Sequence, residues 1–396
     1  MLYIKNNTIV SSALKEAFSD SIYPEKATSG IGYFDATTAL NESAFANQIA
    51  MFEAYHSFVD LESEVIEAYS AAEGNEALLE GYLRPLKENF LEKAFTTVKN
   101  FLMKIVNAVW KGIKAVAKFF VGIFNTIKNK VKSFIKKKEE AKEEDKKEEV
   151  KQAAPGIPAQ QAAPAAKAEE APKAAAKSEA PKAAEKAAPA AEKTEKILPF
   201  GTLLSTLYGL RAFVYDMTEK LTDHMVQRGF YVKKCTFKPS DLPKELNING
   251  LLGFDDHTGQ IKSKGPSEMA NIIKDHYSDK MQTVTLGTCK EFVKFVENQS
   301  DAVKKLFDDC TERLNKVKMF LNKVEFGKDE TANKRAETVY LHPSTEDEDV
   351  KAHNDIMKYN IGYFNSVVTA INNFSYATMK LWDESAKIVT DFASAK

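Results

Sequence analysis

The sequence lacks a hydrophobic run long enough to cross a membrane. In its most apolar part, the longest stretch without lysine is the nine-residue segment FFVGIFNTI at 119–127, whereas a transmembrane helix needs about 20 mainly apolar residues. The N-terminus has no continuous apolar segment after a basic start, so we expect no secretory signal. Cys235, Cys289 and Cys310 form no CxxC pair and are too few for a disulfide framework, which predicts a reducing compartment.

The common catalytic and nucleotide-binding signatures are also absent. The chain has no GxxxxGK[ST], GxGxxG, HExxH or GxSxG pattern, each of which supports a specific chemistry. The most suggestive metal ligands are Asp255-Asp256-His257, but no second histidine lies nearby at helical spacing, so we interpret this segment as a solvated turn. We therefore predict a protein that is not an enzyme, with no cofactor, no metal and no small-molecule substrate.

Acidic residues and arginine are missing from one segment that is otherwise rich in charge. Between Lys93 and Lys138 there are twelve lysines and no Asp or Glu, although the formal net charge of the whole chain is only −1. Apolar residues recur in this segment every three or four positions, and Lys104, Lys111 and Lys118 recur every seven on another side. This spacing predicts a long amphipathic helix with a broad apolar face, which could bend at Gly112 or Gly122.

Two kinds of partner fit such a helix. In one interpretation the apolar face enters an anionic membrane surface with the lysines among the headgroups. In the other, the apolar face packs on neighbouring helices or other copies, while the lysines bind a polyanion such as DNA without reading its sequence. A purely structural alternative is that the acidic N-terminal region folds back and neutralises the lysines. The candidate binding residues are Lys104, Lys111, Lys114, Lys118, Trp110, Phe119, Phe120 and Phe124.

Composition divides the chain into four regions. Residues 1–90 are predicted to be an acidic helical region with Phe52, Tyr55, Val59, Ile66 and Tyr69 on one face, and residues 91–138 are the basic amphipathic helix. Residues 139–196 are rich in Ala, Pro, Lys and Glu and are predicted to be a disordered low-complexity linker, because they have little to bury. Residues 197–396 are predicted to be a helical bundle with an irregular region around 231–268, whose turn signals fit a loop with a short hairpin.

The C-terminal region contains three helical seams of apolar residues. They run from Leu203 to Leu221, from Val303 to Val324 and from Phe364 to Phe392, each with steps of three or four residues. We expect these seams to pack on one another within the chain. The acidic run Glu346 to Asp349 is predicted to begin the last helix, where carboxylates interact favourably with the helix N-terminus. The predicted fold class is therefore mostly α.

The order of these parts resembles the structural and internal head proteins of large tailed bacteriophages. The shared features are the acidic helical segment, the lysine-aromatic helix FLMKIVNAVWKGIKAVAKFFVGIF, the Ala-Pro-Lys-Glu spacer and the helical C-terminal region. The resemblance implies a virion protein inside the head that contacts other virion proteins, copies of itself or packaged DNA. It also implies cleavage after glutamate in small-x-Glu or Leu-x-Glu triplets, for which the candidates are Glu73, Glu76 and Glu80. The alternative location is the cytoplasm, at a membrane surface.

Overall fold

The structure of the protein is a computed structural model. The structure describes residues 33–71, 76–152, 195–223, 234–238, 242–323 and 347–394. Within these ranges the chain forms six α-helices and two small antiparallel sheets. The prediction of a mostly α protein with a C-terminal helical bundle is confirmed. Most of the predicted linker, residues 153–194, lies outside the described residues.

Helices α2 (Tyr33–Ala71) and α3 (Glu76–Gln152) form an antiparallel helical hairpin. Tyr33 contacts Phe119 with ring centroids 5.7 Å apart, and farther along the pair a side-chain ion pair joins Lys93 to Glu64 at 2.8 Å. The acidic region thus folds back on the basic helix, as the structural alternative proposed. Of the five residues predicted on one face of this region, Phe52 is exposed and Tyr55 is partly buried against the core. The side chains of the other three lie outside the described residues.

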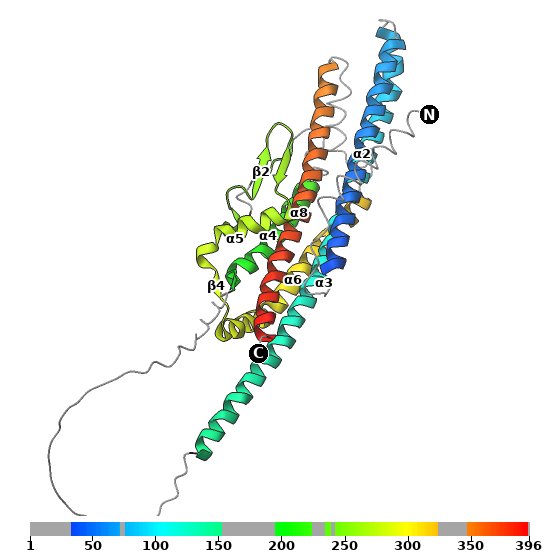
Figure 1. The fold of residues 1–396 in the computed structure, drawn as a ribbon. Coiled ribbons are helices and arrows are strands. Elements are labelled where there is room, and N and C mark those ends of the chain that lie inside the picture. Colours follow the sequence, from blue (N-terminus) through cyan, green and yellow to red (C-terminus); the bar gives the residue numbers. More distant parts are fainter. Residues whose placement is uncertain are drawn as a thin grey trace, which may run out of the picture.

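The basic helix is longer than its sequence limits of 91–138 suggested. Helix α3 is continuous from Glu76 to Gln152 and has no break at Gly112 or Gly122. The prediction that the linker begins at residue 139 is therefore wrong for 139–152. Lysine and glutamate alternate in blocks there and can pair one turn apart, as Lys136 and Glu140 do at 3.7 Å. Figure 1 shows the C-terminal end of α3 running past the other helices.

The C-terminal region packs three long helices, α4 (Phe200–Asp223), α6 (Leu286–Lys323) and α8 (Asp347–Ser394). The predicted seams are buried at nearly every described position, and α8 begins inside the predicted acidic run. The seam residues therefore pack against other parts of the same chain. At the C-terminal end of the third seam, Ile388 is partly buried and Phe392 is exposed.

The N-terminal hairpin and the C-terminal helices share one hydrophobic core. Helix α3 packs against α6 and α8, and α2 also packs against α8 (Figure 1). The ring of Phe120 on α3 lies 5.7 Å from that of Phe307 on α6 and 5.6 Å from that of Trp382 on α8. The parts on either side of the linker are therefore not held apart as two separate units.

The segment between α4 and α6 is irregular, as predicted, and includes a β-hairpin. Strands β2 (Leu252–Asp255) and β3 (Gln260–Ser263) pair antiparallel, followed by α5 (Pro266–His276). Two-residue strands β1 (Lys196–Ile197) and β4 (Gln282–Thr283) also pair, and 3₁₀ turns cover Lys244–Leu246 and Ser278–Lys280. At Gly259, φ is +68° and a Cβ would lie 2.4 Å from the Tyr359 ring, so both conformation and space require glycine.

Candidate functional site

The lysines predicted to bind a polyanion form a ridge on the outer side of α3. We use the name lysine ridge for Lys104, Lys111, Lys114 and Lys118, all of which are exposed. Steps of seven residues return a helix to nearly the same side after two turns, so three of the four lie in line. Because α3 has no acidic residue between Lys93 and Lys138, no carboxylate of the same segment can neutralise this ridge.

Other helices neutralise the lysines on either side of the ridge's centre. Lys104 pairs with Glu53 of α2, and Lys132 farther along α3 pairs with Glu297 of α6. None of the ion pairs among the described residues includes Lys111, Lys114 or Lys118. The centre of the ridge therefore keeps a positive charge that no ion pair among the described residues neutralises.

Trp110 lies beside the ridge, where α3 meets α6. The Lys114 ammonium lies 3.9 Å from the centroid of the Trp110 ring, and the Lys318 ammonium of α6 lies 5.9 Å from it. Both distances are within the range of cation–π attraction. The buried indole N–H of Trp110 has no hydrogen-bond acceptor among the described residues. Trp110 thus holds two lysines near one another at the α3–α6 boundary.

The predicted aromatic face of α3 belongs to the core of the protein. Phe119, Phe120 and Phe124 are 0%, 1% and 5% exposed. They pack against Tyr33, Phe307 and Trp382 from three other helices. In this fold these three side chains cannot insert into a lipid surface, because the helices of the same chain already cover them.

A groove lies between α3 and α6, next to Lys118. Its volume is about 390 Å³. The groove combines an apolar floor with a rim that carries two ammonium groups and one carboxylate. Its lining residues are Ala117, Lys118, Phe120, Val121, Phe124, Asn125, Ser300, Val303, Lys304, Phe307 and Asp308. We call it the α3–α6 groove.

The candidate processing residues lie at the corner of the helical hairpin. Glu73 is outside the described residues, which leave 72–75 between the end of α2 and the start of α3. Glu76 begins α3, and Glu80 follows in its second turn. A cut after any of the three would separate α2 covalently from most or all of α3.

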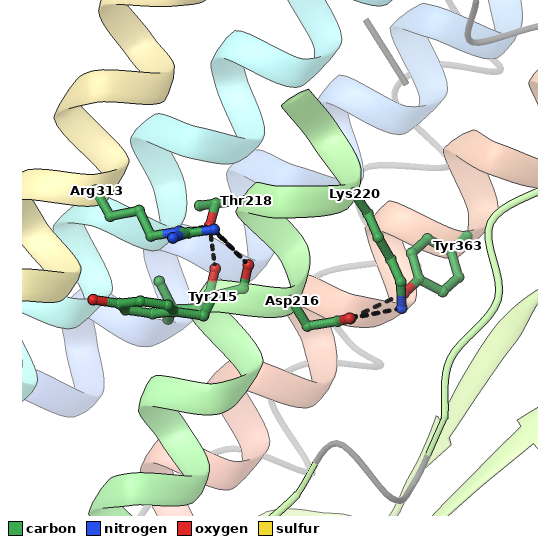
Figure 2. Close-up of polar contacts among 7 residues, drawn as sticks. Tyr215, Asp216, Thr218, Lys220, Arg313 and Tyr363 are labelled. Atoms are coloured by element: carbon green, nitrogen blue, oxygen red, sulfur yellow. Dashed lines mark hydrogen bonds and ion pairs between the residues drawn. The ribbon is translucent and has the colours of Figure 1, made fainter. Parts of the chain in front are cut away.

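A polar network that the sequence did not suggest joins α4 to α6 and α8 (Figure 2). Arg313 of α6 donates from Nε to the Thr218 hydroxyl at 2.6 Å and from a terminal nitrogen to the Tyr215 carbonyl at 3.5 Å. Lys220 pairs with Asp216 at 2.8 Å and donates to the Tyr363 hydroxyl of α8 at 3.1 Å. The contacts satisfy polar groups between packed helices, so the network fixes their alignment.

The Asp255-Asp256-His257 segment forms the turn between β2 and β3. Asp255 accepts hydrogen bonds from the backbone N–H groups of His257 and Thr258 at 3.0 and 3.3 Å, and it pairs with Lys262 at 3.0 Å. The hydrogen bond from Lys262, followed by the two backbone bonds, lowers the pKa of the Asp255 carboxyl. These contacts stabilise a turn, as the sequence suggested.

The three cysteines are buried free thiols. Burial raises the pKa of Cys289 to about 11 and that of Cys310 to about 12, which opposes formation of a reactive thiolate. The part of the chain that the structure describes contains no group of three or more His, Cys, Asp or Glu placed to hold a metal ion. Likewise, no described helix has the length and apolar content to span a bilayer.

The arrangement therefore offers charge and shape for binding: a lysine ridge, a neighbouring groove and buried polar contacts between helices. Comparison of this chain with protein-family models, with curated proteins and with solved structures gives no match.

Proposed function

We propose that this chain is a non-enzymatic structural component of a phage virion, located inside the head, whose lysine ridge binds packaged DNA or another polyanion of the capsid interior. The observation that carries the proposal is the division of α3 into two sides. Its apolar side is buried, including Phe119 and Phe120, and its lysine side is exposed. The exposed lysines can act through charge and hydrogen bonds.

The physical basis of this binding is the release of counterions from the polyanion. Each phosphate that a lysine neutralises frees condensed cations, so affinity falls as salt rises. Lysine makes point-charge contacts and has no planar fork for reading base edges. Lys111, Lys114 and Lys118 project from one rigid helix, which suits contact with a regular backbone and not with a particular sequence.

A membrane-surface role is supported less well. Insertion of α3 requires its phenylalanines to leave the core, where Phe120 and Phe124 contact Trp382. Burying a large aromatic side chain stabilises a fold by roughly 2–3 kcal/mol, so exposing several of them in water or moving them to lipid requires the bundle to open first. Polyanion binding needs no such opening.

The test is the salt dependence of DNA binding by the full-length protein. A ridge variant, K111Q/K114Q/K118Q, should show a log–log salt slope reduced by about 0.9 for each lysine that contacts a phosphate. The matched control is K238Q/K244Q/K323Q, which removes three exposed lysines elsewhere and should keep more of the slope. Equal slopes for both variants would contradict ridge binding.

The virion assignment has its own test. The protein should co-purify with mature particles, and its N-terminus there should be Gly74, Ala77 or Gly81 if the glutamate triplets are cleaved. Such a cut leaves α2 attached only through its contacts with α3 and α8. An intact Met1 in particles would remove the cleavage but not the structural role, whereas absence from particles would remove both.

A further inference from the structure

Helix α2 presents a stripe of large apolar side chains to solvent. Phe45, Ile49 and Phe52 are 42%, 40% and 47% exposed, and their spacing of four and three residues places them on one side of the helix. We call these residues the α2 stripe. The opposite side of α2 is buried and consists mainly of small or polar residues: Ala36, Thr37, Leu40, Ser43, Asn47, Ala50 and Ala54.

This orientation reverses the usual pattern of a surface helix. An amphipathic helix normally turns its large apolar residues to the core, and an isolated exposed one needs no explanation. Three in one stripe form a contiguous patch, which is typical of an interaction surface. The patch is rigid because α2 is fixed from behind, where Asn47 donates to the side chain and carbonyl of Asn365 on α8.

The charges around the α2 stripe define what it can bind. Residues 33–71 contain seven carboxylates and no lysine or arginine. Glu42 lies near Phe45 and is exposed. Glu53 follows Phe52 directly, but it already pairs with Lys104 of α3, so Glu42 supplies the negative charge beside the stripe. A complementary surface should therefore combine an apolar depression with positive charge at its edge.

The α3–α6 groove of the same chain has this combination. Phe120, Phe124, Val303 and Phe307 form its apolar floor, and Val121 at its side is 53% exposed. Lys118 and Lys304 supply positive charge to the rim, against the single carboxylate of Asp308. Apolar residues on α2 with the carboxylate of Glu42 beside them thus match an apolar groove with flanking lysines.

We propose that the α2 stripe of one copy of this chain docks into the α3–α6 groove of a second copy. A contact within one chain is excluded, because α2 lies along α3 with the stripe on the side opposite its buried face. In a one-way contact, the copy that supplies the stripe keeps a free groove and the copy that supplies the groove keeps a free stripe. Such a contact is heterologous, and further copies can extend it. Heterologous contacts build rings or open filaments. This proposal concerns assembly and does not rest on polyanion binding.

The experiment uses two variants of the full-length protein. The stripe variant, F45S/I49S/F52S, changes only exposed side chains, and the groove variant, V121S/K304E, changes one exposed apolar residue and one rim charge. Circular dichroism and thermal unfolding should give wild-type curves for both, because none of these side chains belongs to the core. Sedimentation velocity over a concentration series then reports association.

Wild type should form species larger than a dimer as its concentration rises, and each variant alone should be monomeric, with association weakened by about tenfold or more. An equimolar mixture of the two variants should form dimers and nothing larger, because the mixture contains only one kind of complementary pair, the intact stripe of the groove variant with the intact groove of the stripe variant. Wild-type species larger than a dimer, together with a mixture that stops at dimers, distinguish a heterologous contact from a symmetric one.

Several outcomes would overturn the proposal. Self-association of the groove variant alone would indicate a stripe-to-stripe contact. A monomeric wild type that binds anionic vesicles, with binding lost in the stripe variant, would assign the stripe to a lipid surface. If the charges contribute as argued, K304E alone should weaken association and mixing it with E42K should restore part of it; no restoration would remove the electrostatic part of the argument.

Discussion

Helices α2 and α8 belong to the same bundle but use opposite kinds of residue to pack. Helix α8 buries large side chains around most of its circumference, and Tyr363, Phe364, Phe374 and Trp382 are all 0% exposed. Apart from Tyr33 and Leu40, helix α2 buries mainly alanines and short polar residues, and it leaves Phe45, Ile49 and Phe52 exposed. Helix α8 is thus stabilised by burial of large side chains. Helix α2 is stabilised by small side chains that let it approach its neighbours closely.

The difference concerns how strongly each helix is attached. Hydrophobic stabilisation grows with the apolar area buried, at roughly 25 cal/mol per Å², so α8 gains more per residue than α2. Part of the attachment of α2 comes instead from hydrogen bonds, such as Tyr55 to the Lys358 carbonyl at 3.2 Å and Asn372 to Ser43 at 3.4 Å. A typical hydrogen bond contributes about 1 kcal/mol net. Helix α2 is therefore the more easily released of the two.

The largest effect that separates the two helices should come from truncating phenylalanine in each. Phe374 packs against Phe213 with centroids 5.6 Å apart and is fully buried, so F374A should lower the free energy of unfolding by about 3–5 kcal/mol. The matched variant F45A on α2 should change it by less than about 0.5 kcal/mol. Urea unfolding of both variants measures the difference, and equal losses would show that Phe45 is buried in solution.

The helices and their seams could be predicted from the sequence because burial imposes a period close to 3.6 residues. The steps from Leu203 to Leu221 were sufficient for α4, for example, because every one of those positions faces another helix. The shared core could not be predicted from the sequence. The apolar face of α3 indicates that other residues must bury it, but it does not indicate which helices those residues belong to. From the sequence alone the aromatic residues of α3 fit either lipid insertion or packing on neighbouring helices, and the fold buries Phe119, Phe120 and Phe124 among helices of the same chain.

The orientation of α2 was missed for a different reason. Sequence reasoning groups large apolar residues on one face, as it does Phe52 and Tyr55, without showing which of them are covered. The available signal was the spacing of small residues, with Ala36, Leu40, Ser43, Asn47, Ala50 and Ala54 three or four positions apart. That spacing allows helices to approach closely; Gly112 on α3 supports it, since a Cβ there would lie 3.0 Å from Leu40. The network around Arg313 had no sequence signal, because its members are distant in the chain.

The second prediction concerns local opening. Amide hydrogens of α2 should exchange through an opening whose free energy is lower than that of α8 by on the order of a few kcal/mol, because α2 buries fewer large side chains than α8 does. Hydrogen exchange with mass spectrometry, comparing peptides from residues 36–54 and 357–389, measures both helices in one sample. Equal protection in the two sets would mean that α2 opens only with the whole fold.

The third prediction tests the polar attachment directly. Asn47 is 1% exposed and donates to Asn365, so N47A should lower the free energy of unfolding by about 1–2 kcal/mol and increase exchange mainly in α2. The control N129A removes an exposed asparagine from α3 and should have almost no effect. If N47A lowers the free energy of unfolding but accelerates amide exchange equally in α2 and α8, the separate attachment of α2 would be contradicted.

The smallest effect should appear at alkaline pH, at the boundary between α2 and α8. Burial, with a further contribution from Tyr376, raises the pKa of the Tyr33 hydroxyl above its usual value of about 10, and burial also raises the pKa of Tyr55 and Tyr376. The neutral phenols are favoured by the fold, so their contribution is complete below pH 10, where both states are protonated. It declines above that pH, because the unfolded chain ionises first.

Each such tyrosine should therefore reduce the free energy of unfolding by up to about 1.4 kcal/mol per pH unit above 10, and by less than about 1 kcal/mol at pH 10.5. Y33F removes one of these groups, so its stability should fall less steeply than that of wild type between pH 9 and 10.5. The buried thiols of Cys289 and Cys310 add to the decline in both proteins and cancel in the comparison. Urea unfolding at a series of pH values measures the slopes, and identical slopes would show that the Tyr33 hydroxyl is already in contact with water, as it would be if α2 were detached.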